Sequence, residues 1–300
     1  MFLTKSEVSI LTPIEGDRGF ELLRLIEDIG RTCWKSEEKR SAKMDRLMKD
    51  PTYEPETWQD SSHQDLRQSH VSRKITDDFI RFIVKVGHES VLEHVTVSVL
   101  FSVDRSTSHQ LVRHRLGSFC QESQRWCDYE SKGHIAFIMP NNIPLESGFY
   151  EWREGIPRKK PARLLHHAER WSQRPYPGSP IEEWPVGIGF LRDREANAED
   201  LPWHKWPSSA GYKLEAFQFA ENAYFKLRSA GDKPEDARCV LPNATKTDIV
   251  ATFNLRQWRH VFQERAINPK AQRAIREVTA LVLAKFKETP LAPVFEDITN

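Results

Sequence analysis

The sequence predicts an α+β fold. Residues 95–103 and 249–253 alternate apolar and polar side chains with a period of two, which is typical of half-buried strands in an antiparallel sheet. Shorter strands are expected at 8–11 and 135–140. Apolar residues recur with the spacing of amphipathic helices in five other stretches, at 22–34, 76–86, 214–227, 255–262 and 268–286.

The size and charge of the chain restrict its class. Its 300 residues suit one large domain, which we expect over residues 1–300. The 44 basic and 43 acidic residues leave a formal charge of +1, so there is no overall positive field to hold nucleic acid. No apolar run approaches the length of a membrane span. Four cysteines without a CxxC pair indicate reduced thiols in a cytoplasmic protein.

Two polar stretches interrupt the predicted elements. Residues 35–70 are charged and have little periodicity, so we expect an irregular insertion or a partly mobile loop. The helix after it is expected to begin at Thr76 and to end at Gly87. Residues 141–209 are rich in Pro, Trp and charge, and such indoles could stack on bases. A compact surface insertion that buries its own indoles is the favoured interpretation.

The stretch 110–126 holds three arginines, a histidine, two serines and several amides, which indicates a recognition surface. Arg113, His114 and Arg115 are consecutive, so neither a helix nor a strand can place all three on one face. We expect a short helix to present the first half of the stretch and a loop over 116–125 to present the second. Such a loop leaves backbone N–H groups free for phosphate. An exposed charged helix would have a similar composition.

A zinc site at His88 fails on spacing. His88 and Glu89 resemble the start of the helical metalloprotease motif, but His94 follows His88 by six residues where that motif needs four. A lone histidine in a turn is more often a hydrogen-bonded structural group. We therefore expect no metal.

The order of residues within 110–126 carries more information than their composition. It resembles the signature of the flavin-dependent thymidylate synthases, in which Arg-His-Arg is followed after seven residues by serine and, two positions later, by arginine. Here the pattern reads Arg113-His114-Arg115, Ser123 and Arg125.

Further matches to the same family cover most of the chain outside the two insertions. A Gly-His-Glu-Ser turn at 87–90 resembles the turn of that family that contacts the flavin. The C-terminal half matches in three more segments, namely Glu235-x-x-Arg238-x-x-Leu241-Pro242, Asn254-x-Arg256 and Arg265.

The resemblance implies that the protein makes thymidylate. The family moves a one-carbon unit from methylenetetrahydrofolate to C5 of dUMP, with FAD carrying reducing equivalents from NADPH. Planar guanidinium groups that are always charged suit these anionic partners. The resemblance also implies helices packed around an antiparallel sheet, and a homotetramer whose active sites are shared between chains.

The same resemblance assigns site residues. Arg265 would be catalytic, because it would promote loss of the uracil N3 proton and stabilise the resulting anion. Arg238 would reach the dUMP site from a neighbouring subunit. The implied dUMP site comprises Gln110, Arg113, Gln121, Glu122, Ser123, Gln124, Arg125, Arg238 and Arg265. The implied FAD site comprises Cys33, His88, Ser90, Arg113, His114, Arg115, Gln121, Asn254, Arg256 and His260.

Some positions depart from the family pattern. Gln121 stands where many members have Glu, Trp126 where most have Tyr, and His260 where Asn is frequent. None of these departures removes a charged anchor. They put in doubt the individual contacts of Gln121 and His260.

Two other functions stay open. A nucleic-acid-binding protein would use the arginine cluster and the Trp-rich insertion, and its binding would depend steeply on salt. A relative of the family could act on another pyrimidine nucleotide or use another carbon donor.

Cys120 is a less favoured covalent nucleophile. Nearby arginines could lower the pKa of its thiol, but the Pro-Cys signature of the unrelated thymidylate synthases is missing.

Overall fold

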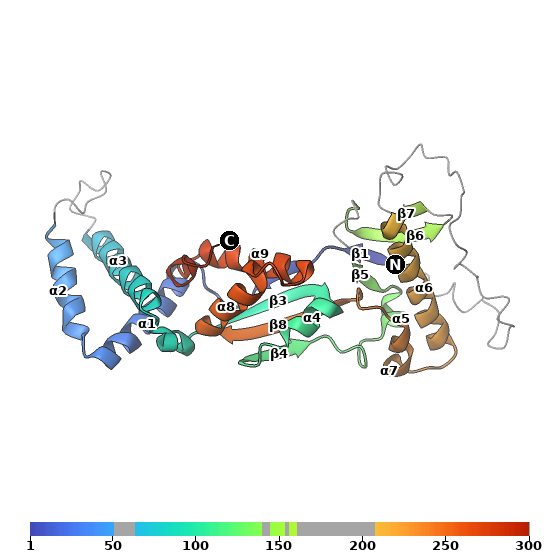
Figure 1. The fold of residues 1–300 in the computed structure, drawn as a ribbon, viewed down its shortest axis with the longest axis horizontal. Helices are drawn as coiled ribbons and strands as arrows, with labels where there is room; N and C mark the ends of the chain where they lie inside the picture. Colours follow the sequence, from blue (N-terminus) through green and yellow to red (C-terminus); the bar gives the residue numbers. More distant parts are fainter. Residues whose placement is uncertain (51–63, 140–144, 154–155, 161–207, 300) are drawn as a thin grey trace. The chain divides into compact units, whose positions relative to one another are not determined.

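The computed structural model describes residues 1–50, 64–139, 145–153, 156–160 and 208–299 (Figure 1). Contacts within the chain define two compact units. Unit 1 comprises Met1–Glu7, Ser102–Gln110 and Cys120–Ile249. Unit 2 comprises Val8–Phe101, Leu111–Phe119 and Val250–Asn300. Helices and sheets are mixed in the chain, which confirms the predicted α+β class.

A four-stranded sheet with the order β5-β1-β6-β7 lies in unit 1. Strand β1 (Phe2–Thr4) pairs in parallel with β5 (Ala136–Ile138) and antiparallel with β6 (Gly148–Arg153), which pairs antiparallel with β7 (Ile156–Lys160). The long helix α6 (Ser208–Ser229) supplies apolar side chains to the same core as this sheet. The rings of Phe137 and Phe217 stack there with centroids 4.9 Å apart.

Short helices complete unit 1. They are α5 (Tyr129–Lys132), α7 (Pro234–Ala237) and the 3-10 helix η8 (Arg238–Val240). Helix α4 (Arg105–Leu111) begins where Asp104 accepts a hydrogen bond from the backbone N–H of Thr107, at 2.7 Å. The sequence predicts a short helix at this place, as the element that presents the first half of the stretch 110–126.

The second sheet has the order β2-β3-β8-β4. Its strands are β2 (Glu7–Ile10), β3 (Thr96–Asp104), β8 (Lys246–Asn254) and β4 (Gly117–Gln121). Every second side chain of β3 and of β8 is buried, as the alternation of the sequence predicts.

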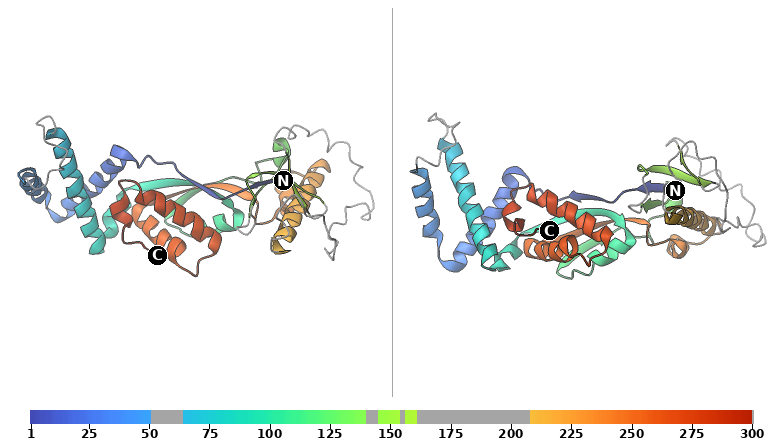
Figure 2. Two further views of the ribbon diagram at one scale, coloured as in Figure 1. Left: turned by 90° about the horizontal axis from the view of Figure 1, so that it is seen from above. Right: turned by 45° about the horizontal axis from the view of Figure 1, so that its top comes forward.

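The core of unit 2 is aromatic. It lies among α8 (Leu255–Phe262), α9 (Arg273–Lys287), α10 (Ala292–Phe295) and the strands β3 and β8, which Figures 1 and 2 show next to these helices. Trp258 is fully buried and its indole N–H donates to the carbonyl of Val97 at 3.0 Å. Phe253, Phe262 and Phe286 contact its ring, so one tryptophan joins the sheet to the helices above it.

Three helices form the remainder of unit 2: α1 (Gly16–Trp34), α2 (Glu37–Met48) and α3 (Gln64–Lys85). The expectation of an irregular segment over 35–70 is wrong for its described residues, because α2 and the first turns of α3 lie there. Helix α3 also begins twelve residues before the predicted start at Thr76. A small apolar cluster of Leu47, Val71 and Ile75, with Met44 and Met48 against it, supports this pair of helices.

The structure corrects three smaller expectations. The predicted loop at 116–125 contains strand β4, and the chain leaves helix α4 before Arg113. Helix α9 begins at Arg273, after a turn, where the sequence indicated a start near 268. The expected compact insertion over 141–209 lies mainly outside the described residues. The part of it that the structure describes contains strands β6 and β7. Every helix in the described part of the chain is too short or too polar to span a lipid bilayer.

Candidate functional site

The first half of the signature lies in unit 2, beside the segment that follows α8. Arg265 belongs to the π-helix η9 (Gln263–Ile267), which continues α8. Its Nε donates to Nε2 of His114 at 3.1 Å. His114 is only 7 % exposed, and its ring meets those of Phe253 and His260 edge-on. Two predicted site residues separated by 151 positions in the sequence are therefore joined directly.

The pKa of His114 is lowered to about 4. Burial is the main cause, and the positive charge of Arg265 is the second. The imidazole is consequently neutral near pH 7. A neutral imidazole can accept a hydrogen bond at Nε2, whereas an imidazolium would donate from both nitrogens. The low pKa thus maintains the acceptor that orients the Arg265 guanidinium.

Arg113 and Arg115 differ from His114 in exposure. Both side chains are exposed, and neither guanidinium forms an ion pair with any residue that the structure describes. Alternation across the turn buries the histidine and turns the arginines outward. This arrangement leaves two cations in unit 2 for an anionic partner.

Strand β8 leads directly into two further predicted residues. Asn254 caps α8, because its side-chain oxygen accepts from the backbone N–H of Gln257 at 2.8 Å. Arg256, in the first turn, pairs with Glu93 at 2.5 Å, and both side chains are about half exposed. His260 is exposed one turn later. Asn254 therefore has a structural role in capping, and its amide nitrogen is left as a donor.

The other predicted flavin contacts lie around the end of α1 and the start of the 3-10 helix η3 (Glu89–His94). Cys33, His88 and Ser90 are all exposed. The ring of His88 lies edge-on to Trp34, with centroids 5.2 Å apart.

The second half of the signature lies in unit 1, where it borders a pocket of about 360 Å³. Arg125 approaches Glu235 of α7 at 3.5 Å, and the serine oxygen of Ser123 accepts from the backbone N–H of Arg125. The pocket is lined by Ser123, Arg125, Trp126, Lys233, Pro234 and Glu235. The structure thus brings the signature loop to the Glu-x-x-Arg segment that begins at Glu235.

Other predicted dUMP contacts in unit 1 are held by the fold. The amide of Gln121 donates to Ser108 at 2.8 Å and to Thr247 at 3.2 Å, which fixes the side chain between α4 and β8. Gln124 is buried near the hydroxyl of Tyr129, and its amide nitrogen makes no hydrogen bond of good geometry among the described residues. A buried unpaired donor is costly unless a ligand or water meets it.

The remaining contacts predicted for this unit are partly exposed. Gln110, at the end of α4, donates to the carbonyl of Ser106 at 3.5 Å. Glu122 approaches Lys132 at 3.4 Å, and the Nε of Arg238 donates to the carbonyl of Glu235 at 3.1 Å.

A family model described as thymidylate synthase complementing protein matches residues 21–293. The chain belongs to the thymidylate synthase complementing protein family. A flavin-dependent thymidylate synthase of Mycobacterium marinum is 30% identical over 233 residues, which cover 74% of this chain and 74% of the relative. One of Pyrococcus furiosus is 26% identical over 244 residues, covering 80% of this chain and 72% of that protein.

Two solved structures have a similar fold. Thymidylate Synthase X of Helicobacter pylori, solved with FAD and dUMP, has a TM-score of 0.51 at 19% identity and covers 98% of both chains. A UMP/dUMP methylase, PolB of Streptomyces cacaoi, solved with 5-Br dUMP, has a TM-score of 0.54 at 19% identity and covers 99% of this chain and 96% of its own.

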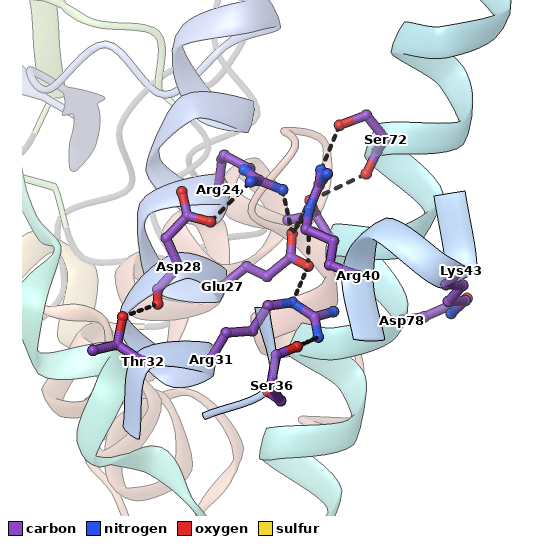
Figure 3. Close-up of polar contacts among 11 residues, drawn as sticks. Arg24, Glu27, Asp28, Arg31, Thr32, Ser36, Arg40, Lys43, Ser72 and Asp78 are labelled. Carbon is purple, nitrogen blue, oxygen red and sulfur yellow. Dashed lines mark hydrogen bonds and ion pairs between the residues drawn. The ribbon is translucent and has the colours of Figure 1, made fainter. Parts of the chain in front are cut away.

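One polar cluster of this family member was not predicted from its sequence. Glu27 of α1 is fully buried and accepts from Arg31 at 2.6 Å, Arg24 at 3.0 Å and Arg40 of α2 at 3.3 Å (Figure 3). The hydroxyl of Thr76 donates to the same carboxylate at 2.6 Å. The sequence signal was available, because Arg24, Glu27 and Arg31 have the spacing of helical ion pairs.

Proposed function

We propose that this protein converts dUMP to dTMP by reductive methylation. In this proposal methylenetetrahydrofolate donates the carbon, and FAD, reduced by NADPH, supplies the electrons. Membership of the family supports the reaction class. The observation that carries the proposal is the contact between Arg265 and a neutral His114, because it fixes a permanent cation in the orientation that an electrophilic role requires.

Arg265 would act on the uracil ring of the bound nucleotide. Its guanidinium would favour loss of the N3 proton and stabilise the negative charge that remains on the ring. A fixed cation beside developing charge contributes about 3 kcal/mol when water is excluded. His114 would act through Arg265 by holding its Nε.

The signature loop of unit 1 would bind dUMP. The exposed guanidinium of Arg125 suits the phosphate, and its pairing with Glu235 is long enough, at 3.5 Å, to be exchanged for a stronger partner. The unpaired amide nitrogen of Gln124 offers a further donor. In a homotetramer with shared sites, Arg238 would serve the nucleotide of a neighbouring chain.

The donor set of unit 2 fits FAD. Arg113 and Arg115 present two exposed cations suited to a diphosphate, and Arg256 and the amide of Asn254 add donors. When bound, the flavin supplies the electron transfer that no side chain can perform. Ser90, His88, Cys33 and His260 are the other proposed contacts.

A second candidate substrate is UMP or another uridylate. Two observations support UMP as a candidate substrate. The fold is similar to that of a UMP/dUMP methylase, and Gln121 stands where Glu is more frequent in the family. A reducing, cytoplasmic location is also proposed, because all four cysteines are free thiols.

The test compares a complete reaction mixture with mixtures that each lack one component. Purified protein is incubated without oxygen with FAD, dUMP, methylenetetrahydrofolate and NADPH, and the nucleotides are separated. The proposal expects dTMP only when all components are present. NADH in place of NADPH, and UMP in place of dUMP, decide the electron donor and the substrate. Absence of a methylated nucleotide from the complete mixture would reject the proposal.

A further inference from the structure

The loop over residues 122–128 joins strand β4 to helix α5 in unit 1 and carries Ser123 and the last arginine of the signature. Its first residue is tied to the second sheet, because the backbone N–H of Glu122 donates to the carbonyl of Asp248 at 2.8 Å. A turn follows, in which the backbone N–H of Cys127 donates to the carbonyl of Ser123 at 2.8 Å. The backbone of the loop is therefore held at its start and across its turn.

The far end of the loop is anchored to α6 through Asp128. The carboxylate of Asp128 accepts from Nη2 and Nε of Arg228, at 2.7 and 3.2 Å. The same carboxylate caps α5, because it accepts from the backbone N–H of Glu130 at 2.9 Å. Tyr129 is the first residue of α5, and its ring lies edge-on to that of Tyr224, with centroids 5.6 Å apart. Helix α5 thus presents Tyr129 from a fixed position.

Side chains in the middle of the loop alternate in exposure. Ser123 and Arg125 are exposed and line the pocket of unit 1, whereas Gln124 between them is only 7 % exposed. The amide of Gln124 lies near the hydroxyl of Tyr129, which is 5 % exposed. Gln124 therefore belongs to the inner face of the loop, and the two signature residues belong to its outer face.

Three buried polar atoms behind the loop lack a hydrogen bond of good geometry among the described residues. They are Nε2 of Gln124, the hydroxyl oxygen of Tyr129 and Nη1 of Arg105. The pKa of Tyr129 is raised, chiefly by burial and then by the negative charge of Glu122, so the hydroxyl keeps its proton at neutral pH. Its oxygen can accept hydrogen bonds, and both the amide nitrogen and the guanidinium are donors. A small shift of the loop would therefore let these atoms satisfy one another.

We propose that Tyr129 is a positioning residue of the nucleotide site. Its hydroxyl accepts a hydrogen bond from the Gln124 amide when dUMP is bound, and this bond holds Ser123 and Arg125 toward the nucleotide. The inference rests on the proposed function, in which these two residues bind dUMP. Without a nucleotide the outer face of the loop is loosely held, because Arg125 lies 3.5 Å from Glu235. The phosphate of dUMP fixes that outer face, and Tyr129 fixes the inner face.

Titration calorimetry of dUMP into the full-length, FAD-loaded protein tests the inference. Tyr129→Phe keeps the ring and removes the hydroxyl. It is expected to raise the Kd for dUMP about fivefold, because one hydrogen bond is lost from the complex alone. In urea unfolding without nucleotide this variant should be as stable as wild type, since the hydroxyl makes no good hydrogen bond there. A purely structural role predicts the reverse, namely lower stability and an unchanged Kd.

Tyr150→Phe is the matched control. Tyr150 is another buried tyrosine of unit 1, and its hydroxyl already donates to the carbonyl of Glu146 at 3.0 Å. The control should therefore lower the free energy of unfolding and leave the Kd for dUMP unchanged.

A second variant tests the donor. Gln124→Leu removes the amide at similar volume and should raise the Kd by the same factor as Tyr129→Phe. The double variant should bind dUMP no more weakly than either single variant, because both changes remove one hydrogen bond. The same titrations with UMP cover the second candidate substrate.

The outcomes separate this inference from the proposed function. An unchanged Kd in Tyr129→Phe would overturn the inference, even in a protein that forms dTMP. A double variant whose losses multiply would also overturn it, because the two groups would then act separately. A fivefold loss of binding in a protein that forms no dTMP would support the inference and reject only the proposed reaction. A wild-type protein that binds neither dUMP nor UMP would overturn both.

Discussion

At the scale of single residues, the contact between His114 and Arg265 links the burial of the histidine to the catalytic role that we propose for the arginine. A histidine in water would be partly charged near pH 7 and would repel the arginine. Burial keeps it neutral, so that it accepts the hydrogen bond from Arg265 Nε. The sequence predicted both residues in the site, but it could not predict this contact, because nothing in the spacing of the motif states which residues meet.

His114→Ala should remove the acceptor that orients Arg265. We expect kcat to fall about 10- to 100-fold, since a misplaced catalytic group loses most of its effect. His114→Gln keeps an acceptor oxygen and should recover part of the loss. Steady-state kinetics with both variants checks this. If both variants had the kcat of the wild type, the hydrogen bond would make no contribution to catalysis.

The pKa of His114 also predicts how stability depends on pH. The folded-state pKa of about 4 lies below the ordinary histidine value of 6.5, so the unfolded chain takes up a proton first as the pH falls. This contribution to stability is present above pH 6.5 and is lost progressively toward pH 4. Between pH 7 and pH 5 the loss should be about 2 kcal/mol.

Urea unfolding of wild type and His114→Gln at both pH values isolates the contribution of His114 to the free energy of unfolding. The variant carries no titratable group at position 114, so its stability should fall less on acidification. Other groups titrate equally in both proteins and cancel in the difference. Identical losses in the two proteins would contradict the assignment of a buried, neutral histidine.

At the scale of elements, strands β3 and β8 were easier to predict from the sequence than helix α2 and the first turns of α3. Strands β3 and β8 bury every second residue, so their alternation is visible in the sequence. Helix α2 and the first turns of α3 bury few apolar residues, and α2 is tied to α1 by the ion pair of Arg40 with Glu27. A search for apolar periodicity therefore interpreted their polar surfaces as a loop.

Glu27→Gln should destabilise the packing of these three helices strongly. The change leaves Arg24, Arg31 and Arg40 around a neutral amide, and breaking a buried charge network costs about 3 to 5 kcal/mol. Glu21→Gln on the same helix is the control, because the Glu21–Arg18 pair is exposed and contributes less than about 1 kcal/mol. Chemical denaturation of both variants measures the difference. Similar effects of the two changes would show that the buried carboxylate is not structural.

At the scale of the whole molecule, the predicted site residues are distributed over both units. Gln121 to Arg125 and Arg238 belong to unit 1, whereas Arg113 to Arg115 and Arg265 belong to unit 2. The resemblance to the family predicted the residues of both units from the sequence, because it depends on the order and spacing of residues along the chain and not on their positions in the fold. The sequence could not show which groups serve the same nucleotide, since that depends on the assembly of chains.

Sharing of sites between chains is testable by mixing. Arg238→Ala and Arg265→Ala chains should each be inactive alone. If Arg238 completes a neighbour's site, about one quarter of the sites in randomly mixed oligomers would be intact. Activity assays after co-refolding, with mixed oligomers verified by differently tagged chains, measure the recovery. No recovery would place both arginines in the site of one chain.

The absorbance spectrum of the bound flavin during a titration with dUMP tests the central claim most directly. We expect a flavin spectrum that shifts saturably as dUMP binds, and a loss of that shift in Arg125→Ala while the flavin remains bound. A protein that binds no flavin, or a flavin spectrum that stays unchanged while dUMP binds, would contradict it.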